Sequence, residues 1–268
     1  NLSFVLLFVA LAPVLIDRVP FRKQLFIFTG LYPFLAGWLI FGWFALPPVA
    51  SQDIGGLALT LIIGITGIAF SLPIGILLAL GRTSNLPVIK ILSVLFIEFI
   101  RGVPLIALLF IASTMLNYFM PPGTTFDLLV RVLIMVTLFA SAYMAEVIRG
   151  GIAGIPKGQI EAASAAGLSY WKTMYLIVMP QVLKISIPGI VNTFIGLFKD
   201  TTLVLIIGMF DLLGMGKAAL TNLNWAGLHR EMYLFVAVAF FFCCYGMSLY
   251  SGYLCLLYTS PSPRDLRK

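Results

Sequence analysis

Seven stretches of apolar residues alternate with polar segments along the chain. They cover residues 2–16, 24–46, 57–81, 88–116, 127–148, 186–209 and 230–255. A helix needs about 20 predominantly apolar residues to cross about 30 Å of hydrocarbon, because each residue adds about 1.5 Å. The first stretch is shorter than this, which indicates a span cut at its start, and the others are long enough. Because backbone polar groups in lipid must bond internally, the pattern predicts an all-α polytopic membrane protein.

The fourth stretch, 88–116, tests this interpretation because it contains Glu98 and Arg101. Two central charges raise the free energy of membrane insertion by roughly 6 kcal/mol, and the Leu, Ile, Val and Phe residues lower it by roughly 6–8 kcal/mol. The stretch is therefore expected to insert, with protein neighbours sheltering the two charges.

The composition supports a membrane location. Hydrophobic residues make up 61% of the chain and charged residues 10%, with a mean hydropathy of +1.07. A soluble domain has about 25% charged residues, so this surplus of apolar surface is expected to face lipid. The net charge of +7 does not indicate nucleic-acid binding, because the basic residues are dispersed among short loops.

The basic residues are distributed asymmetrically between alternate loops. One set of loops carries Arg18, Arg22, Lys23, Arg82, Arg149, Lys157, Lys172 and Lys184. In the other set, 47–56 and 117–126 have no Lys or Arg, and 210–230 has Lys217 and Arg230. Since cytoplasmic loops carry the excess of Lys and Arg, the first set is predicted to be cytoplasmic. The chain then begins outside and ends inside.

The cytoplasmic connection 150–185 is unusually long and contains no span of its own, which is typical of a functional segment. It reads as two short helices joined by a bend. Pro156 suits a first helical turn and 159–166 is rich in Ala, while Gly167 suits a left-handed helix end. Ser169 is expected to cap the second helix and Pro180 to end it. The residues alone fit either a docking site for a partner or an amphipathic hairpin lying on the membrane.

The same segment resembles the EAA loop of ABC importer permeases: Glu-Ala-Ala, three residues, Gly, nine residues, then Ile-x-Leu-Pro. The matching positions are Glu161, Ala162, Ala163, Gly167, Ile177 and Pro180. Met179 replaces the Leu of the pattern, a volume-conserving change. The resemblance implies that this loop is the coupling helix that sits in a groove of the ATP-binding subunit.

Further positions resemble the branch of this family that takes up polar amino acids. They are Thr60-Leu61, Gly75, Ala79, Arg82-Thr83-Ser84, Glu98, Arg101-Gly102-Val103-Pro104-Leu105, Phe110 and Lys199-Asp200-Thr201-Thr202-Leu203. The branch usually has Ser where this chain has Thr202. These matches imply polar L-amino acids as cargo without naming one.

The resemblance also implies an architecture and a set of partners. A type I importer core of five transmembrane helices would occupy 55–252, with about two further helices in 1–54, and 253–268 would be a tail unrelated to the family. Expected partners are ATP-binding cassette subunits that hold ATP and Mg, a second permease subunit, an extracytoplasmic amino-acid-binding protein and lipid. The location implied is the bacterial inner membrane, with the EAA loop cytoplasmic.

Several intramembrane residues carry candidate roles. Glu98 and Arg101 are three residues apart and share a helix face, as do Glu146 and Arg149. Glu98 and Arg101 fit either a structural ion pair or a place along the substrate path. Pro104 fits a gating bend or a packing kink.

Four consecutive residues in the sixth stretch are further candidates for the substrate path. Lys199 and Asp200 point to different helix faces. One interpretation is that one of the two binds a zwitterionic substrate. The alternative is that each forms a pair with a different helix. Thr201 and Thr202 fit hydroxyl contacts to the substrate or hydrogen bonds back to their own helix.

No catalytic constellation is present in the sequence. His229 is the only histidine, and Gly216-Lys217-Ala218 lacks the leading Gly and the Ser or Thr of a phosphate-binding loop. The three cysteines lack metal-ligand spacing. The chain is therefore predicted to be a transport subunit without enzymatic activity or cofactor of its own. The alternative is an ion-gradient-driven secondary amino-acid transporter, for which inverted repeats would be expected.

Overall fold

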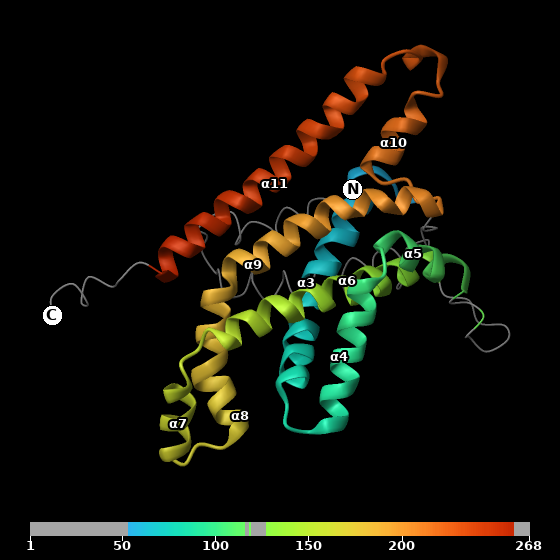
Figure 1. The fold of residues 1–268 in the computed structure, drawn as a ribbon. Coiled ribbons are helices and arrows are strands. Elements are labelled where there is room, and N and C mark those ends of the chain that lie inside the picture. The colour runs from blue at the N-terminus through green and yellow to red at the C-terminus, as the bar shows by residue number, and fades with distance from the viewer. Residues whose placement is uncertain (1–52, 116–117, 119–126, 260–268) are drawn as a thin grey trace, which may run out of the picture. The chain divides into compact units, whose positions relative to one another are not determined.

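The computed structural model describes residues 53–115, 118 and 127–259, and within these ranges the regular elements are helices without strands. The predicted stretches 2–16 and 24–46 lie outside the described residues. The elements (Figure 1) are α3 (Gly56–Thr83), α4 (Pro87–Gly102), α5 (Leu105–Phe110), η2 (Ile111–Met115), α6 (Leu128–Ala153), α7 (Lys157–Ala165), α8 (Tyr170–Thr173), η4 (Met174–Val178), α9 (Met179–Asp200), η5 (Thr201–Ile207), α10 (Leu212–Ala219), η6 (Leu223–Trp225) and α11 (His229–Thr259). The prediction of an all-α fold is confirmed.

Four helical segments of the described chain are long and apolar enough to cross a membrane. They are Gly56–Thr83, Leu128–Ala153, Tyr170–Ile207 and His229–Leu256. A fifth is obtained if the broken pair Pro87–Gly102 and Leu105–Met115 counts as one span. The five predicted stretches from 57 onward each fall on one of these segments.

The stretch 88–116 forms two helices bent by 101° at a short break, at the position where Pro104 was expected to bend the span. Helix α4 ends at Gly102, and Pro104 stands at the N-cap of α5 with extended backbone angles, φ −59° and ψ 139°. Proline lacks a backbone N–H and disfavours helical geometry at the residue before it, so the helix breaks at Val103. A π-helical turn, Ile111–Met115, follows α5.

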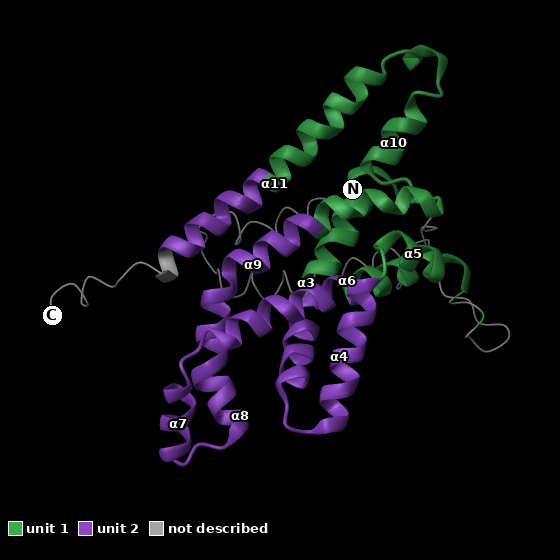
Figure 2. Ribbon diagram, in the orientation of Figure 1, with its two compact units in different colours: residues 1–69, 103–137, 197–244 green, residues 70–102, 138–196, 245–268 purple. Residues whose placement is uncertain are grey.

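The chain divides into two compact units, each built from parts of several helices (Figure 2). Unit 1 comprises 1–69, 103–137 and 197–244, and unit 2 comprises 70–102, 138–196 and 245–268.

In unit 2, small residues allow helices to approach each other closely. A Cβ added at Gly75 in α3 would lie 2.7 Å from Cβ and Cγ of Met144 in α6, and one added at Gly189 in α9 would lie 2.7 Å from Val147 Cγ1. Such contacts are typical of membrane helices, whose association depends on close packing.

In unit 1, hydrogen bonds join the start of α3 to the start of α10. The Gly56 N–H donates to the Phe210 carbonyl at 2.8 Å, and the Leu212 N–H donates to Thr60 Oγ1 at 3.2 Å. The Asp211 side chain is fully buried and caps α10 by accepting from the Gly214 N–H at 2.8 Å. Burial raises the pKa of the Asp211 carboxyl, and the hydrogen bonds from backbone N–H groups act in the opposite direction.

Candidate coupling site

The segment 157–178 forms the predicted helical hairpin, in which α7 packs against α8 and η4 (Figure 1). Pro156 occupies the N-cap of α7 rather than its first turn. Gly167 adopts φ +74°, the Gly167 N–H donates to the Ser164 carbonyl at 3.0 Å, and the Leu168 N–H donates to the Ala163 carbonyl at 3.1 Å. These two bonds form a Schellman motif, so the predicted left-handed helix end at Gly167 is confirmed.

The second helix of the hairpin does not end at Pro180, contrary to the prediction. Ser169 occupies its N-cap position, without a side-chain cap bond, and the helical run continues through η4 and α9 as part of the segment Tyr170–Ile207. Pro180 is tolerated because the preceding π-helical turn, Met174–Val178, changes the local hydrogen-bond pattern. The Gln181 side-chain amide also donates to the Ile177 carbonyl at 2.8 Å. The hairpin is therefore continuous with a membrane span.

The hairpin has an inward and an outward face. Ala163 is 3% exposed and Val178 is fully buried. In contrast, Trp171 is 68% exposed and Tyr175 is 78% exposed. The motif residues Glu161, Ala162, Gly167 and Pro180 are exposed, and Ile177 is half-buried. The hairpin therefore exposes a carboxylate and two large aromatic side chains, which are suited to contact with another protein.

The inward face belongs to an apolar cluster that joins the hairpin to the spans of unit 2. Its buried members are Ala79 in α3, Ile97 in α4, Met144, Ala145 and Ile148 in α6, Ile155, Met174, Val178, and Val182 and Ile190 in α9. Closely packed protein interiors resist deformation. A displacement of the hairpin is therefore expected to displace the helices against which it packs.

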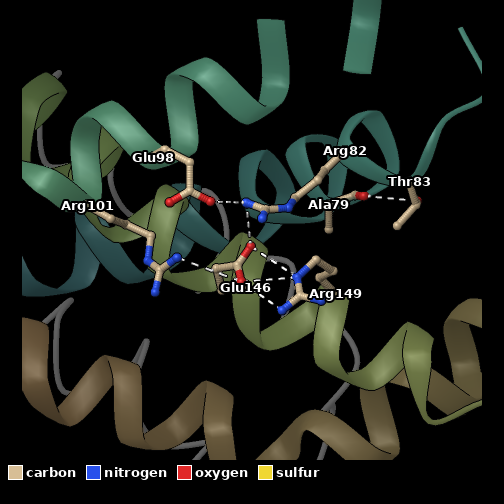
Figure 3. A network of polar contacts seen from close by, with 7 residues as sticks. All are labelled: Ala79, Arg82, Thr83, Glu98, Arg101, Glu146 and Arg149. Carbon is tan, nitrogen blue, oxygen red and sulfur yellow. Dashed lines mark hydrogen bonds and ion pairs between the residues drawn. The ribbon is translucent and has the colours of Figure 1, made fainter. Parts of the chain in front are cut away.

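A group of five charged side chains, here called the charged cluster, joins α3, α4 and α6 within unit 2 (Figure 3). Its members are Arg82, Glu98, Arg101, Glu146 and Arg149. The Glu146 carboxylate lies 3.0 Å from Arg82 Nη1, 3.0 Å from Arg149 Nη2 and 3.7 Å from Arg101 Nη1. Arg82 Nη1 also donates to Glu98 Oε1 at 2.6 Å. Glu146 is the central carboxylate, with a side chain 17% exposed.

The charged cluster only partly matches the pairing suggested by sequence spacing. Glu146 and Arg149 pair within α6 as their spacing of three suggests, with Arg149 Nε donating to Glu146 Oε2 at 3.0 Å. Glu98 and Arg101 have the same spacing, but the structure pairs Glu98 with Arg82 and Arg101 with Glu146. The Arg101 guanidinium also lies 5.6 Å from the centre of the Tyr143 ring, a cation–π contact.

The candidate residues at the end of α9 lie in unit 1. Lys199 is exposed, Asp200 is half-buried and Thr201 is buried at 1% exposure. Thr201 Oγ1 donates to the Phe198 carbonyl at 2.8 Å, and Thr202 Oγ1 donates to the Lys199 carbonyl at 2.9 Å. Both hydroxyls thus bond back to their own helix, one of the two arrangements that the sequence allows.

One residue that sequence reasoning missed is Arg131, in the first turn of α6. It is 8% exposed, and its Nη1 donates to the carbonyls of Ala112 at 3.2 Å and Ser113 at 2.5 Å. A guanidinium at the end of a helical segment satisfies carbonyls that have no helical partner. A lone Arg near the start of an apolar stretch was the available signal. In the described residues no group of three or more His, Cys, Asp or Glu is placed to hold a metal ion.

Replacing Gly167 with Ala is expected to destabilise the hairpin. Gly167 has open space around it but a φ of +74°, whereas Gly158 in α7 has open space and a helical backbone. A side chain in the left-handed region costs about 1–2 kcal/mol. Gly167→Ala should therefore increase the rate of proteolytic cleavage between α7 and α8 in the detergent-purified protein. Gly158→Ala is the matched control, and equal cleavage rates in the two variants would contradict the prediction.

Comparison with known proteins identifies the family. The sequence profile of the family described as binding-protein-dependent transport system inner membrane component matches residues 71–254. The inner membrane amino-acid ABC transporter permease protein YhdY of Escherichia coli strain K12 is 50% identical, over 95% of this chain and 70% of that protein. The glutamate/glutamine/aspartate/asparagine transport system permease protein BztC of Rhodobacter capsulatus is 47% identical, over 94% of this chain and 71% of that protein.

Solved structures agree with the sequence comparison. The crystal structure of an amino acid ABC transporter with histidines is similar with a TM-score of 0.64 and 28% identity, covering 77% of this chain and 92% of that one. The MetNI methionine ABC transporter in an inward-facing conformation, 19% identical with a TM-score of 0.57, shares the fold. The family profile covers most of the chain, and two permeases are similar over nearly its full length. The chain therefore belongs to the family of binding-protein-dependent transport system inner membrane components, the permease subunits of ABC transporters.

Proposed function

We propose that this chain is the permease subunit of an ATP-driven importer that carries polar L-amino acids across the bacterial inner membrane. The names of its relatives support this cargo class, since BztC is described as transporting glutamate, glutamine, aspartate and asparagine. The observation that carries the proposal is the hairpin 157–178, which exposes Glu161, Trp171 and Tyr175 and buries Met174 and Val178 among residues of the spans.

The exposed face of the hairpin is the docking surface for a separate ATPase subunit. Glu161 provides a carboxylate for a basic residue of that partner, and Trp171 and Tyr175 provide apolar contact area around it. Aromatic side chains near a charged pair are common at energetically important interface positions. The partner subunits bind ATP and Mg and hydrolyse ATP, and this chain contributes the docking contact.

Transport follows from movement of the hairpin. Closure of two ATPase subunits on ATP displaces the hairpin of each permease subunit. The buried side chains of Met174 and Val178 transmit this displacement to the other members of the apolar cluster. Two permease subunits, identical or related, enclose the path and expose it alternately to each side. An extracytoplasmic binding protein delivers the amino acid, and the cytoplasmic orientation of the hairpin follows from the basic residues around it.

The proposal is tested by reconstitution in lipid vesicles. The chain is co-expressed with its candidate partner subunits, purified in mild detergent and reconstituted, and uptake of labelled glutamate and glutamine is measured with ATP inside the vesicles. Uptake is expected only when the ATPase, the binding protein and ATP are all present. An excess of unlabelled glutamate or aspartate should compete with the label, and an excess of leucine should not. Uptake driven by an ion gradient in vesicles containing this chain alone would support the secondary transporter instead.

A further inference from the structure

Most residues of helix α4 are exposed in the described part of the chain. Its buried residues are Ser93, Ile97 and Ile100. Other residues along it are largely exposed, including Leu92 at 60% and Leu95 at 65%. From α4, the buried Ile97 belongs to the apolar cluster that contains Met174 and Val178 of the hairpin, and the partly buried Phe96 packs against it. Apolar packing therefore gives α4 a narrow link to the hairpin.

The charged cluster provides α4 with a second link. Arg101 in α4 contacts Glu146 in α6 at 3.7 Å, and Glu98 in α4 contacts Arg82 in α3 at 2.6 Å. Arg82 in turn contacts Glu146 at 3.0 Å. Glu98 and Arg101 of α4 are thus both joined to the same carboxylate, Arg101 directly and Glu98 through Arg82 (Figure 3).

Glu146 is also adjacent to the apolar cluster. Met144, Ala145 and Ile148 on α6 are buried there together with Met174 and Val178 of the hairpin segment. Displacement of the hairpin therefore acts on the turn of α6 that carries Glu146. From this turn the ionic contacts continue to α4.

Ionic contacts have a property here that apolar contacts lack. Apolar attraction is non-directional, whereas charge-assisted guanidinium–carboxylate bonds add geometric specificity to their energy. Three guanidiniums and two carboxylates give the cluster a net charge of +1. Removing the charge of Glu146 would leave three guanidiniums facing the single carboxylate of Glu98, so α4 would lose its ionic attachment to α6.

We propose that Glu146 is a positioning residue that transmits movement of the coupling hairpin from α6 to α4 through Arg82 and Arg101. The inference rests on the proposed function, because it assumes that ATP hydrolysis in a partner moves the hairpin. It assigns Glu98 and Arg101 to mechanical coupling rather than to the substrate path. It also predicts that loss of Glu146 separates hydrolysis from transport, since the docking surface around Glu161 is left intact.

The experiment measures both activities in the complete reconstituted complex. Amino-acid uptake and binding-protein-stimulated ATP hydrolysis are recorded for the wild type, Glu146→Gln and Glu146→Asp. Glu146→Gln should lower the amount of amino acid transported per ATP by about tenfold while hydrolysis changes by no more than about twofold. Glu146→Asp, which keeps the carboxylate, should restore part of the ratio. A merely structural role would lower uptake and hydrolysis together.

Two further variants separate the possible results. Glu98→Gln leaves Glu146 with its three guanidiniums and should lower the ratio less than Glu146→Gln, while Glu231→Gln, an exposed residue in the first turn of α11, should leave the ratio unchanged. If Glu146→Gln fails to assemble, Arg101→Gln replaces it, because Glu146 then keeps Arg82 and Arg149. Its ratio should also fall, but by less than the tenfold expected for Glu146→Gln, since Glu98 remains joined to Glu146 through Arg82. An unchanged ratio in the assembled variants, or a proportional loss of both activities, would overturn the inference. Absence of ATP-dependent uptake in the wild type would instead contradict the proposed function.

Discussion

Glu161→Lys is expected to abolish stimulation of the partner ATPase while leaving membrane insertion intact. Glu161 is exposed on α7, in the hairpin that also exposes Trp171 and Tyr175. Reversing its charge would place two cations opposite each other in the proposed interface. Breaking a hydrogen-bonded interfacial charge pair costs about 2–5 kcal/mol. The stimulated hydrolysis rate should therefore fall by about tenfold or more when the subunit concentration is limiting. The rate is measured in vesicles with the binding protein and substrate present.

Glu231→Lys provides the matched control, because it makes the same change of charge at an exposed residue of α11. The control is expected to keep the stimulated rate, and both variants should be recovered in the membrane fraction at wild-type amounts. Retention of normal stimulation by Glu161→Lys would refute the docking role of the hairpin. Recovery of stimulation by a second, acidic substitution at a basic residue of the ATPase would identify the partner side chain.

Gly75→Ala is expected to destabilise unit 2, although alanine is the better helix former. The added Cβ would lie 2.7 Å from Cβ and Cγ of Met144 and 3.2 Å from the Ala145 nitrogen, all close to the backbone of α6. Atoms so near the backbone cannot move aside without shifting the helix, so the cost should be about 1–3 kcal/mol. The expected readout is a lower midpoint of thermal unfolding in detergent.

Gly150→Ala is the corresponding control in α6. Nothing lies within 4 Å of a Cβ added at Gly150, so only the gain in helix propensity applies, about 0.5–1 kcal/mol. The two identical substitutions should thus shift the unfolding midpoint in opposite directions. Equal shifts would show that α3 and α6 do not pack closely at Gly75.

Local sequence signals predicted local structure well. The spans from residue 57 onward were recognised because membrane helices must be long and apolar over their whole length. The end of α7 at Gly167 was recognised because a glycine after an Ala-rich run provides the left-handed residue of a Schellman motif. Both signals depend on neighbouring residues only.

The error at Pro180 arose where a local rule was overridden. Proline was expected to end the second hairpin helix at Pro180 and to bend the fourth span at Pro104, and the structure shows only the bend at Pro104. In the structure the helix continues through Pro180 after a π-helical turn and breaks at Val103, before Pro104. Proline removes one donor in either case, and the surrounding hydrogen bonds and packing decide whether the helix continues.

The amino-acid sequence by itself determined the membrane class, the positions of the spans from residue 57 onward and the hairpin. These properties follow from hydrophobic length and from backbone preferences over a few residues. Only the tertiary structure decided that Glu98 pairs with Arg82, that Arg101 pairs with Glu146, and that Arg131 is buried against the π turn of η2. The partner of a charge depends on which helices pack together, and spacing within one helix carries no information about that.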